Sequence, residues 1–557
     1  MPDPDVVIVG AGAGGLAAAW RLTTQGVRVT LLEAGRRYTP LEDYPQVQED
    51  FQLRDFPYDP ERDPADRPRY GFGHAQPVGP EWDSYRSHNR VFGRYVADDR
   101  RRAVRYEHVR GVGGSTLHFQ AEAHRYHPHA LEMRSRFGVG DDWPLPYAEL
   151  ERYYDLVEEQ IGVAAPADNP WRPRTKPPRL PPHRLSYASQ RLAPAFAAIG
   201  APLLPNSLAI LPRPHHGRPP CNYCNSCTQG CPLGDKGGAD VVWLPPAQAT
   251  DRLDLVTEAQ ALQVEVDANG RATGVVYRKT DGSQARAGGR AVVLAGGAVE
   301  TPRLLLLSTS ARFPHGLANG GGQVGSHLTE HLVWSAVALL PERVDAHRGQ
   351  PIDGAAWRFA VPAVSPRGYI GGFRLSTAHG ALDLRGPAAY AVRFVDGFGR
   401  AHQQRMAEQF GHAVGLLAMG EWLPNADTYV DLDPSQRDEA GLAVARLHSH
   451  LGENERKLLR HMADTTRALV AEVPGAEIVE ETSALDLFSP AHVLGTCRMG
   501  RDPRASVADA DGISHEVPNL AFADGSLLPS SGSGDSPSLT IMAMAVRTAD
   551  RLIARLA

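Results

Sequence analysis

The chain opens with short apolar runs separated by small residues, a pattern that predicts a strand, a helix and a second strand. Residues 6–9 are four consecutive apolar side chains, which is typical of a strand buried on both faces of a parallel sheet. Residues 16–22 favour a helix that ends at Gly26, and residues 27–32 form a second apolar run. This order predicts the start of an α/β fold.

The rest of the chain alternates between helical periodicity, short apolar runs and turns rich in glycine and proline. Residues 267–270 read Asp-Ala-Asn-Gly, a favourable turn between the two strands of a hairpin. Residues 331–483 contain several strand-like stretches and one long helix. The elements expected are helices at residues 148–161, 301–308, 453–473 and 538–556, hairpin strands at 255–266 and 274–278, and a buried strand at 291–294.

Composition narrows the class of protein without naming a function. The 557 residues are 42% hydrophobic and 22% charged, as in ordinary globular proteins, and their number indicates several domains or one large core with insertions. A net charge of −6 offers no basic surface for nucleic acid. No run of eighteen apolar residues is present for a membrane span. No basic segment or cleavage site follows Met1, so we expect a cytoplasmic location.

The turn after the first strand carries a dinucleotide-binding fingerprint. Gly10, Gly12 and Gly15 satisfy the pattern G-x-G-x-x-G. These glycines let the backbone approach a pyrophosphate, and the helix N-terminus supplies free N–H groups. Glu33 ends the second strand, where a carboxylate can accept hydrogen bonds from a ribose diol. A tight turn without a ligand is the alternative, but strand, glycines, helix, strand and acid follow in the order that a nucleotide site requires.

Four cysteines within eleven residues form a second chemical motif, in the loop 219–236. Their spacing is C-x2-C-x2-C-x3-C-P, the run with which bacterial ferredoxins ligate an iron–sulfur cluster. A single loop of this kind can hold a 3Fe-4S cluster with three cysteines or a 4Fe-4S cluster with four. A structural zinc site would be cramped at this spacing, and unligated thiols are the third interpretation. The four candidate ligands are Cys221, Cys224, Cys227 and Cys231.

Several segments spread from one end of the chain to the other follow a recognisable order. Besides the fingerprint with Glu33 they include the Gly-Gly-Ser-Thr of residues 113–116 and the His-Val-Leu-Gly-Thr that begins at His492. The other segments are residues 295–302, 519–526 and 536–541. Together they resemble the glucose–methanol–choline (GMC) flavoprotein oxidoreductases. Residues 423–427 and 430–434 look most like the branch of gluconate, glucose and other sugar dehydrogenases and the related pyranose oxidases.

The resemblance implies an α/β protein with two domains. A discontinuous Rossmann-like domain binds FAD, and a substrate domain contains a mainly antiparallel sheet. The FAD-binding domain would consist of residues 1–125, 200–330 and 486–557, and the substrate domain of residues 126–199 and 331–485. The cysteine loop belongs to the FAD-binding domain in this division.

The resemblance also implies oxidation of an alcohol, with a base for the hydroxyl proton and flavin N5 as the hydride acceptor. It places the base at His492, and imidazole suits that task because its ordinary pKa lies near neutrality. The partner expected before a proline is His or Asn, but this chain has Ser536 there. A hydroxyl can orient a substrate but cannot act as a second base. Ser536 could instead cap the following helix, and Asp535 could replace it if the loop shifts register.

The residues expected to contact FAD come from the matching motifs. His118 corresponds to a histidine that bonds covalently to FAD in pyranose and choline oxidases, and the alternative is a histidine packed near the flavin ring. Asp524 is expected near the ribityl and pyrophosphate groups, or else as a turn residue, and Cys497 is expected to be structural. The full set is Gly10, Gly12, Gly15, Glu33, Gly113, Gly114, Ser115, His118, Ala298, Asp524, Gly525 and Thr540.

The leading hypothesis is an FAD-dependent dehydrogenase that oxidises an alcohol group on a sugar or sugar-like ring. Electrons would then leave through the cluster to an acceptor protein or a quinone. A peroxide-forming oxidase is the second hypothesis, because long-chain alcohol and sterol oxidases of the family also carry a cysteine-rich loop. A lyase with structural FAD and a non-catalytic binding or electron-carrier protein are the other two.

Overall fold

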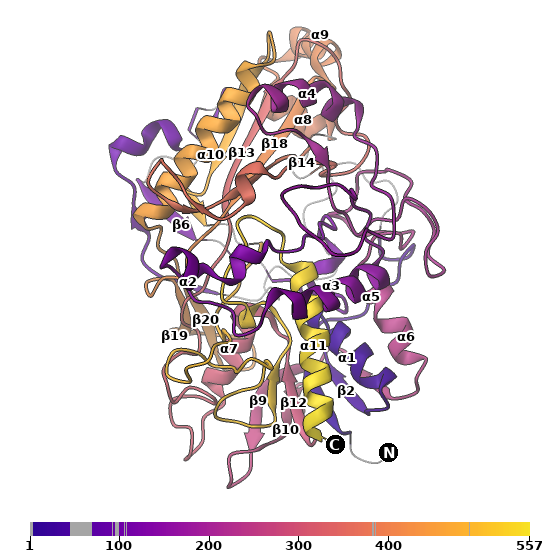
Figure 1. Ribbon diagram of the computed structural model, residues 1–557, viewed down its shortest axis with the longest axis vertical. Helices are drawn as coiled ribbons and strands as arrows, with labels where there is room; N and C mark the ends of the chain where they lie inside the picture. Colours follow the sequence, from indigo (N-terminus) through magenta and orange to yellow (C-terminus); the bar gives the residue numbers. More distant parts are fainter. Residues whose placement is uncertain are drawn as a thin grey trace.

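The computed structural model of the chain forms two lobes, seen one above the other in Figure 1. The lower lobe surrounds a parallel sheet, and the upper lobe surrounds an antiparallel sheet. The first strand begins at the foot of the lower lobe, and the last helix ends there. The structure describes residues 4–44, 70–91, 93–94, 100–104, 106, 108–380, 384, 386–488 and 491–556.

The lower lobe confirms the predicted Rossmann-like architecture. Its five strands pair in parallel throughout, in the order β23-β12-β1-β2-β8. Helix α1 (Ala13–Thr24) connects the first two strands. Because all five strands are parallel, their carboxyl ends lie at one edge of the sheet. The strands are β1 (Val6–Val9), β2 (Val29–Leu32), β8 (Leu253–Val256), β12 (Ala291–Leu294) and β23 (Leu520–Phe522).

The predicted hairpin strand at 255–266 was wrong in its first part. Leu253–Val256 pairs with β2 as the edge strand of the parallel sheet, and the chain then turns at Glu258, whose φ is +54°. The hairpin itself consists of β9 (Gln260–Val266) and β10 (Ala272–Arg278), joined by the predicted turn. β11 (Gln284–Gly288) completes this small sheet. Pairing with β2, a tertiary contact, divides an apolar run that looks continuous in the sequence.

The upper lobe contains the predicted antiparallel sheet. Its strand order is β5-β21-β13-β18-β17-β14-β7, and every neighbouring pair is antiparallel. The two edge strands come from ranges assigned above to the FAD-binding domain, whose boundaries stay a prediction. The strands are β5 (His88–Asn89), β7 (Leu204–Pro205), β13 (Leu332–Leu339), β14 (Gly354–Ala356), β17 (Phe373–Thr377), β18 (Ala413–Gly420) and β21 (Glu477–Ser483).

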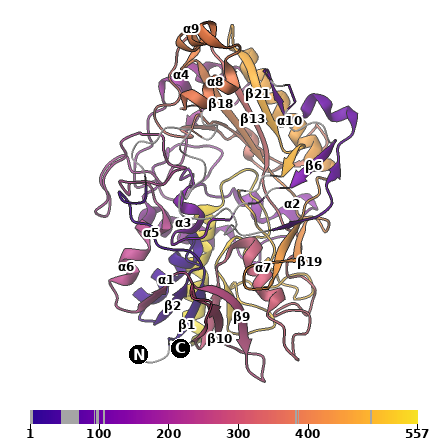
Figure 2. The ribbon, with the colours of Figure 1, turned by 180° about the vertical axis from the view of Figure 1, so that it is seen from behind.

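Helices cover both sheets and connect the lobes. α10 (Glu453–Ala471) packs on β13 and β18 through buried Leu458, Leu459 and Met462. α11 (Ser538–Leu556) begins between the lobes and descends beside α1 and α3 (Tyr147–Ile161), as Figures 1 and 2 show. The predicted helices at α3, α10 and α11 are confirmed. The helix predicted at 301–308 begins earlier, at the glycine turn, as α7 (Gly297–Leu307).

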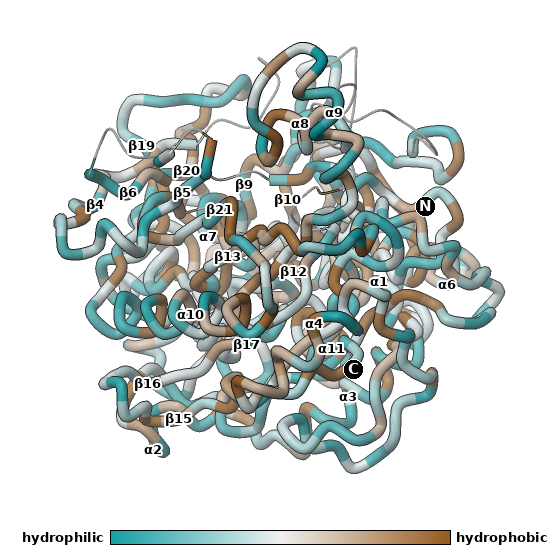
Figure 3. Tube along the Cα trace, turned by 90° about the horizontal axis from the view of Figure 1, so that it is seen from above, coloured by the Kyte–Doolittle hydropathy of each residue, from teal (hydrophilic) through white to brown (hydrophobic). Residues whose placement is uncertain are grey.

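Shorter elements complete the structure. Figure 3 shows hydrophobic stretches along β12 and β13 in the interior and hydrophilic loops around them. Among the described residues, none of the helices combines the length and the apolar character of a membrane span, and the cytoplasmic location stays a prediction. The short helices are α2 (Met133–Phe137), α4 (Tyr187–Ala198), α5 (Ala239–Val242), α6 (Leu244–Gln248), α8 (Pro387–Phe394) and α9 (Gly399–Gln409). The short strands are β3 (Gly71–Phe72), β4 (Gln76–Pro77), β6 (Arg101–Val104), β15 (Ala363–Val364), β16 (Ile370–Gly371), β19 (Tyr429–Arg437), β20 (Ala443–His448) and β22 (Leu487–Phe488).

Candidate active site

Glu33 joins the two glycine-rich loops at the carboxyl edge of the parallel sheet. Its buried carboxylate accepts backbone N–H groups from Ala11 and Gly35 at 2.8 Å and from Gly111 at 3.0 Å. Burial raises the pKa of Glu33, and the three N–H groups oppose that shift. The carboxylate therefore fixes the first glycine turn against the second, and its contact with a ribose stays a prediction.

The glycines of the fingerprint have two different roles. A side chain at Gly10, Gly14 or Gly15 would collide with a neighbouring backbone carbonyl, so these positions allow close packing of strand, helix and turn. Gly12 differs, because no atom lies within 4 Å of the place where its Cβ would be. Gly114, on the second glycine loop, allows close packing as Gly10, Gly14 and Gly15 do. Its φ is +53°, and a Cβ there would lie 2.8 Å from the Cα of Gly12. Gly12 thus opens onto free space at the N-terminus of α1, the geometry of a pyrophosphate cradle.

Asp524 ties the last strand of the sheet to α7. Its buried carboxylate accepts the N–H of Gly297 at 2.8 Å, the hydroxyl of Thr301 at 2.6 Å and the N–H of Ser526 at 2.9 Å. Burial raises the pKa of this group as well. Of the two interpretations left open by the sequence, these bonds support the turn residue, while contact with a cofactor stays a prediction.

Five other predicted cofactor residues surround the same edge. Thr540 shares a hydrogen bond of 2.8 Å with the hydroxyl of Tyr154, so its side chain is already engaged. The carbonyl of Ala298 accepts the hydroxyl of Thr496 at 2.7 Å. The three residues on loops are Ser115, which is exposed, His118, which follows the short helix Gly114–Leu117, and Gly525, whose Cβ position is crowded by Leu494 and Val493.

His492 lies against a second histidine, His331, at the start of β13. The two Nδ1 atoms are 2.9 Å apart, and the rings are nearly perpendicular, at 87°. Nε2 of His331 donates to the carbonyl of Ser531 at 2.6 Å. The carboxylate of Glu330 accepts the backbone N–H of His331 at 2.9 Å and that of His492 at 3.0 Å. The pair is separated by 161 positions, and no spacing in the sequence indicates it.

The surroundings keep both histidines uncharged at neutral pH. Burial lowers the pKa of His492 to about 4, while Glu122 raises it and Arg374 lowers it further. Burial also holds the pKa of His331 well below its ordinary value. Burial raises the pKa of Glu330 to about 8, against the N–H groups of the two histidines. Near pH 6.5, where a free histidine is partly protonated, His492 is therefore unprotonated and has a lone pair that can accept a proton.

Ligand atoms of Glu330, His331 and His492 come within 4.8 Å of one another, a spacing that a metal ion could use. Those atoms are already committed, because the Nδ1 atoms face each other and the carboxylate accepts backbone N–H groups. The arrangement therefore suits proton handling better than metal binding.

Ser536 lies in a buried network built on an ion pair that the sequence did not indicate. Its hydroxyl donates to Glu122 at 2.8 Å, and Arg374 donates to the same carboxylate through both terminal nitrogens at 2.5 and 3.0 Å. Burial opposes ionisation, but Arg374 and the hydrogen-bond donors lower the pKa of Glu122 to about 2. The hydroxyl hydrogen of Ser536 is thus used within the protein, and only its oxygen can face a substrate.

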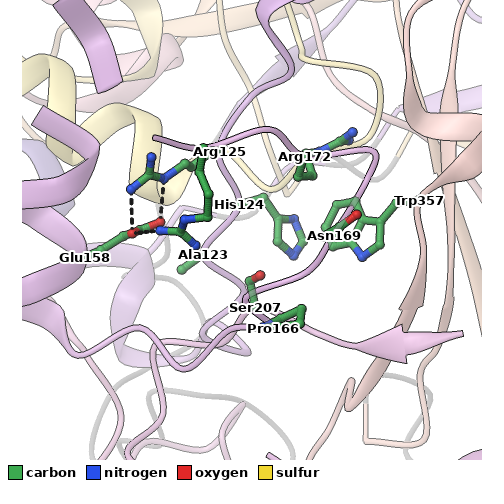
Figure 4. Close-up of a pocket in the computed structure, with 10 residues that line it drawn as sticks. Ala123, His124, Arg125, Glu158, Pro166, Asn169, Arg172, Ser207 and Trp357 are labelled. Atoms are coloured by element: carbon green, nitrogen blue, oxygen red, sulfur yellow. Dashed lines mark hydrogen bonds and ion pairs between the residues drawn. The ribbon is translucent and has the colours of Figure 1, made fainter. Parts of the chain in front are cut away.

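Asp535 lies beside this network, and one terminal nitrogen of Arg172 donates to both of its carboxylate oxygens, at 2.8 and 2.9 Å. Burial raises the pKa of Asp535 to about 6, and Arg172 opposes that shift. Figure 4 shows the cavity beside Arg172, which His124 and Trp357 also line. Its volume of about 30 Å³ has room for about one water molecule, so it is not the binding site of a sugar.

The cysteine loop is attached to the segment that carries His118. The buried ammonium of Lys236 donates to the carbonyls of Leu117 at 2.8 Å, Phe119 at 3.2 Å and Cys227 at 2.7 Å. Burial raises the pKa of the Cys227 thiol and Lys236 lowers it, so this cation favours a thiolate. The loop and the predicted flavin site are therefore in direct contact through one charged side chain.

The cysteines of the loop do not form a compact set of ligand atoms among the residues that the structure describes. In the part of the chain that the structure describes, which includes these cysteines, no three of them offer sulfur atoms within 4.8 Å of one another. Zn–S bonds of about 2.3 Å in a tetrahedron require sulfur atoms only about 3.8 Å apart. Cys497 is fully buried elsewhere, with its N–H on the carbonyl of Ser526 at 2.8 Å.

Comparison with known proteins assigns these features to one family. The family model of GMC oxidoreductases matches residues 210–333 and 424–545, and that of NAD(P)-binding Rossmann-like domains matches residues 8–40. The chain is 30% identical to 2-methyl-1,2-propanediol dehydrogenase of Mycolicibacterium austroafricanum, over 99% of this chain and 95% of that relative. The chain belongs to the GMC oxidoreductases. It is an FAD-dependent enzyme of this family, as the sequence predicted.

Two further proteins are similar over nearly the whole chain. The large subunit of fructose dehydrogenase from Gluconobacter japonicus is 28% identical, over 99% of this chain and 97% of the subunit. The crystal structure of pyridoxine 4-oxidase from Mesorbium loti aligns with a TM-score of 0.62 at 17% identity, over 99% of both chains. That structural likeness shows that the fold is shared.

The residues present at the carboxyl edge fit FAD. Gly12 leaves room beside the N-terminus of α1, and the carboxylate of Glu33 lies next to that turn. The loops that end in Gly114 and Asp524 border the same edge. Residues from four separate segments thus border one edge of the sheet, and the role of each as a cofactor ligand stays a prediction.

Proposed function

We propose that this GMC oxidoreductase oxidises an alcohol group on a sugar or sugar-like polyol, with His492 as the base. The observation that supports this most is the contact of 2.9 Å between Nδ1 of His492 and Nδ1 of His331, in a buried environment that keeps the imidazole of His492 unprotonated. FAD, when bound, supplies the acceptor for the hydride of the alcohol carbon. His492 takes the hydroxyl proton.

The names of the relatives support a substrate with several hydroxyl groups. They include dehydrogenases of 2-methyl-1,2-propanediol and of fructose, and paromamine 6'-oxidase of Streptomyces fradiae. The buried pair of Glu122 and Arg374 holds the loop that carries Ser536. The charges of the same pair act on His492. We propose that Ser536 orients a substrate hydroxyl through its oxygen, since its hydrogen is donated to Glu122.

We further propose that the cysteine loop holds an iron–sulfur cluster through which electrons leave toward an acceptor protein or a quinone. The ferredoxin-like spacing of the cysteines supports this proposal, as does the nearby ammonium of Lys236. The positive charge of Lys236 would stabilise an anionic cluster in this loop.

The function is tested by mixing the FAD-loaded protein anaerobically with fructose, 1,2-diols and aminoglycosides. Substrates are expected to bleach the blue absorbance band of the flavin. In air, reduction of an artificial dye without peroxide would support the dehydrogenase, whereas peroxide formation would support the oxidase. A band that stays unchanged with every alcohol would contradict the proposal and favour a lyase or a carrier.

The cluster is tested by substitution of the cysteines. Protein isolated without oxygen is expected to contain iron and acid-labile sulfide, and Cys221→Ser and Cys227→Ser are each expected to lose most of both. Cys497→Ser is the matched control, because that thiol is buried outside the loop, and it is expected to keep its iron. The proposal fails if the anaerobic wild-type protein contains neither iron nor sulfide.

A further inference from the structure

We infer that His331 is a positioning residue that fixes the tautomer of His492, leaving the lone pair on Nε2 of His492 to accept the substrate proton. This inference rests on the proposed role of His492 as the base. It gives a specific task to a buried histidine that no motif indicates, and it follows from three hydrogen bonds in sequence.

The first step concerns His331. A carbonyl oxygen can only accept, so the bond of 2.6 Å to Ser531 requires a hydrogen on Nε2 of His331. A neutral imidazole carries one hydrogen, and Nδ1 of His331 therefore holds a lone pair. Ser531 is itself fixed, because its hydroxyl donates to Glu421 at 2.6 Å. The acceptor that begins the sequence of bonds is thus held in place from its other side.

The second step concerns His492. Its Nδ1 lies 2.9 Å from Nδ1 of His331, and two lone pairs at that distance would repel each other. Since Nδ1 of His331 is unprotonated, Nδ1 of His492 must carry the hydrogen and donate it. Neutral His492 then has its lone pair on Nε2. The backbone of both histidines is anchored by the same carboxylate of Glu330, which maintains the geometry of the pair.

The third step is proton transfer. The O–H bond of the substrate breaks, and a new N–H bond forms on Nε2 of His492, while the bond between the two histidines keeps its hydrogen. His331 thereby supports the imidazolium that forms, as an aspartate does in a hydrolase triad, but without adding a negative charge. The charged groups that act on His492 are Glu122 and Arg374, and the bond to Ser531 ends the sequence at a carbonyl that cannot carry a proton onward.

The test compares three variants in the FAD-loaded enzyme. His331→Phe removes the acceptor and is expected to slow flavin reduction at saturating substrate by about 10- to 100-fold, with little change in substrate affinity. His331→Gln is expected to recover part of the rate, because its amide oxygen can accept from His492 and its NH₂ can donate to Ser531. The matched control is His379→Gln, another fully buried histidine that hydrogen bonds Gly415 and Ser189 away from the site.

A spectroscopic measurement reads the tautomer directly. In nitrogen-15 spectra of histidine-labelled enzyme, the signals of His492 are assigned by their loss in His492→Asn. The wild-type protein is expected to show a protonated Nδ1 and an unprotonated Nε2, and His331→Phe is expected to show a mixture. If His331→Phe does not fold, the wild-type spectrum alone decides the question.

Two different results separate failure of the inference from failure of the proposed function. A wild-type spectrum with hydrogen on Nε2 of His492, or an unchanged reduction rate in His331→Phe, would overturn the inference. If His492→Asn is inactive in the same experiments, the assignment of His492 as the base still holds. An active His492→Asn would instead overturn the proposed function.

Discussion

Replacement of His492 by Asn is expected to slow flavin reduction by about 10²- to 10⁴-fold, the contribution typical of a general base. Asn keeps the size and polarity of the side chain but cannot take a proton at any relevant pH. Bound FAD and the visible spectrum of the oxidised protein should stay unchanged, because His492 contacts Glu330 and His331 rather than the glycine turns. Stopped-flow absorbance with a reactive alcohol measures the rate.

The pH dependence of the wild-type rate gives an independent check. His492 must be unprotonated, and its pKa is lowered to about 4, so the rate is expected to stay constant from pH 7 to about pH 5 and to fall below. The lowered pKa of His492 also contributes to the free energy of unfolding. This contribution is complete above the ordinary histidine pKa of about 6.5 and is lost as the pH falls toward 4.

A matched control comes from α10. Burial also lowers the pKa of His461 to about 4, but its ring bonds Tyr369 in the upper lobe. His461→Asn should leave both the rate and its acid limb unchanged. An acid limb near pH 6.5 in the wild-type enzyme, or a His492→Asn variant that reduces its flavin at the wild-type rate, would contradict the assignment of the base.

Replacement of Gly12 by Val is expected to weaken FAD binding by about 10- to 100-fold or more while the protein still folds. The new side chain would project into the space where nothing lies within 4 Å, the place that the pyrophosphate requires. The measurement is the FAD content of purified protein, together with titration of the apoprotein by FAD.

Gly14, two positions along the chain, provides the contrasting variant. A Cβ at Gly14 would collide with the carbonyl of Ala523, which belongs to the backbone and cannot turn aside. Gly14→Val is therefore expected to lower the free energy of unfolding and the yield of folded protein, whereas Gly12→Val should keep the unfolding transition of the wild-type apoprotein. Normal FAD content in Gly12→Val would show that the cradle lies elsewhere.

The sequence predicted the elements whose signals are local. The run of residues 6–9 became β1, the glycine turn became the start of α1, and residues 538–556 form α11 within the predicted bounds. Such elements depend on periodicity, turn residues and steric room over a few positions, and these can be counted along a chain. The motifs carried the family assignment for the same reason, since each is a short segment with a fixed spacing.

Contacts between distant segments were decided by the tertiary structure. The bond between His331 and His492 joins positions 161 apart, and that between Glu122 and Ser536 joins positions 414 apart. Lys236 reaches the carbonyl of Leu117 across 119 positions. The division of residues 255–266 into two strands also came from a neighbour, β2. A residue pattern records which side chains exist, but the path of the chain determines which of them meet in a buried site, where burial and hydrogen bonds then fix their charge.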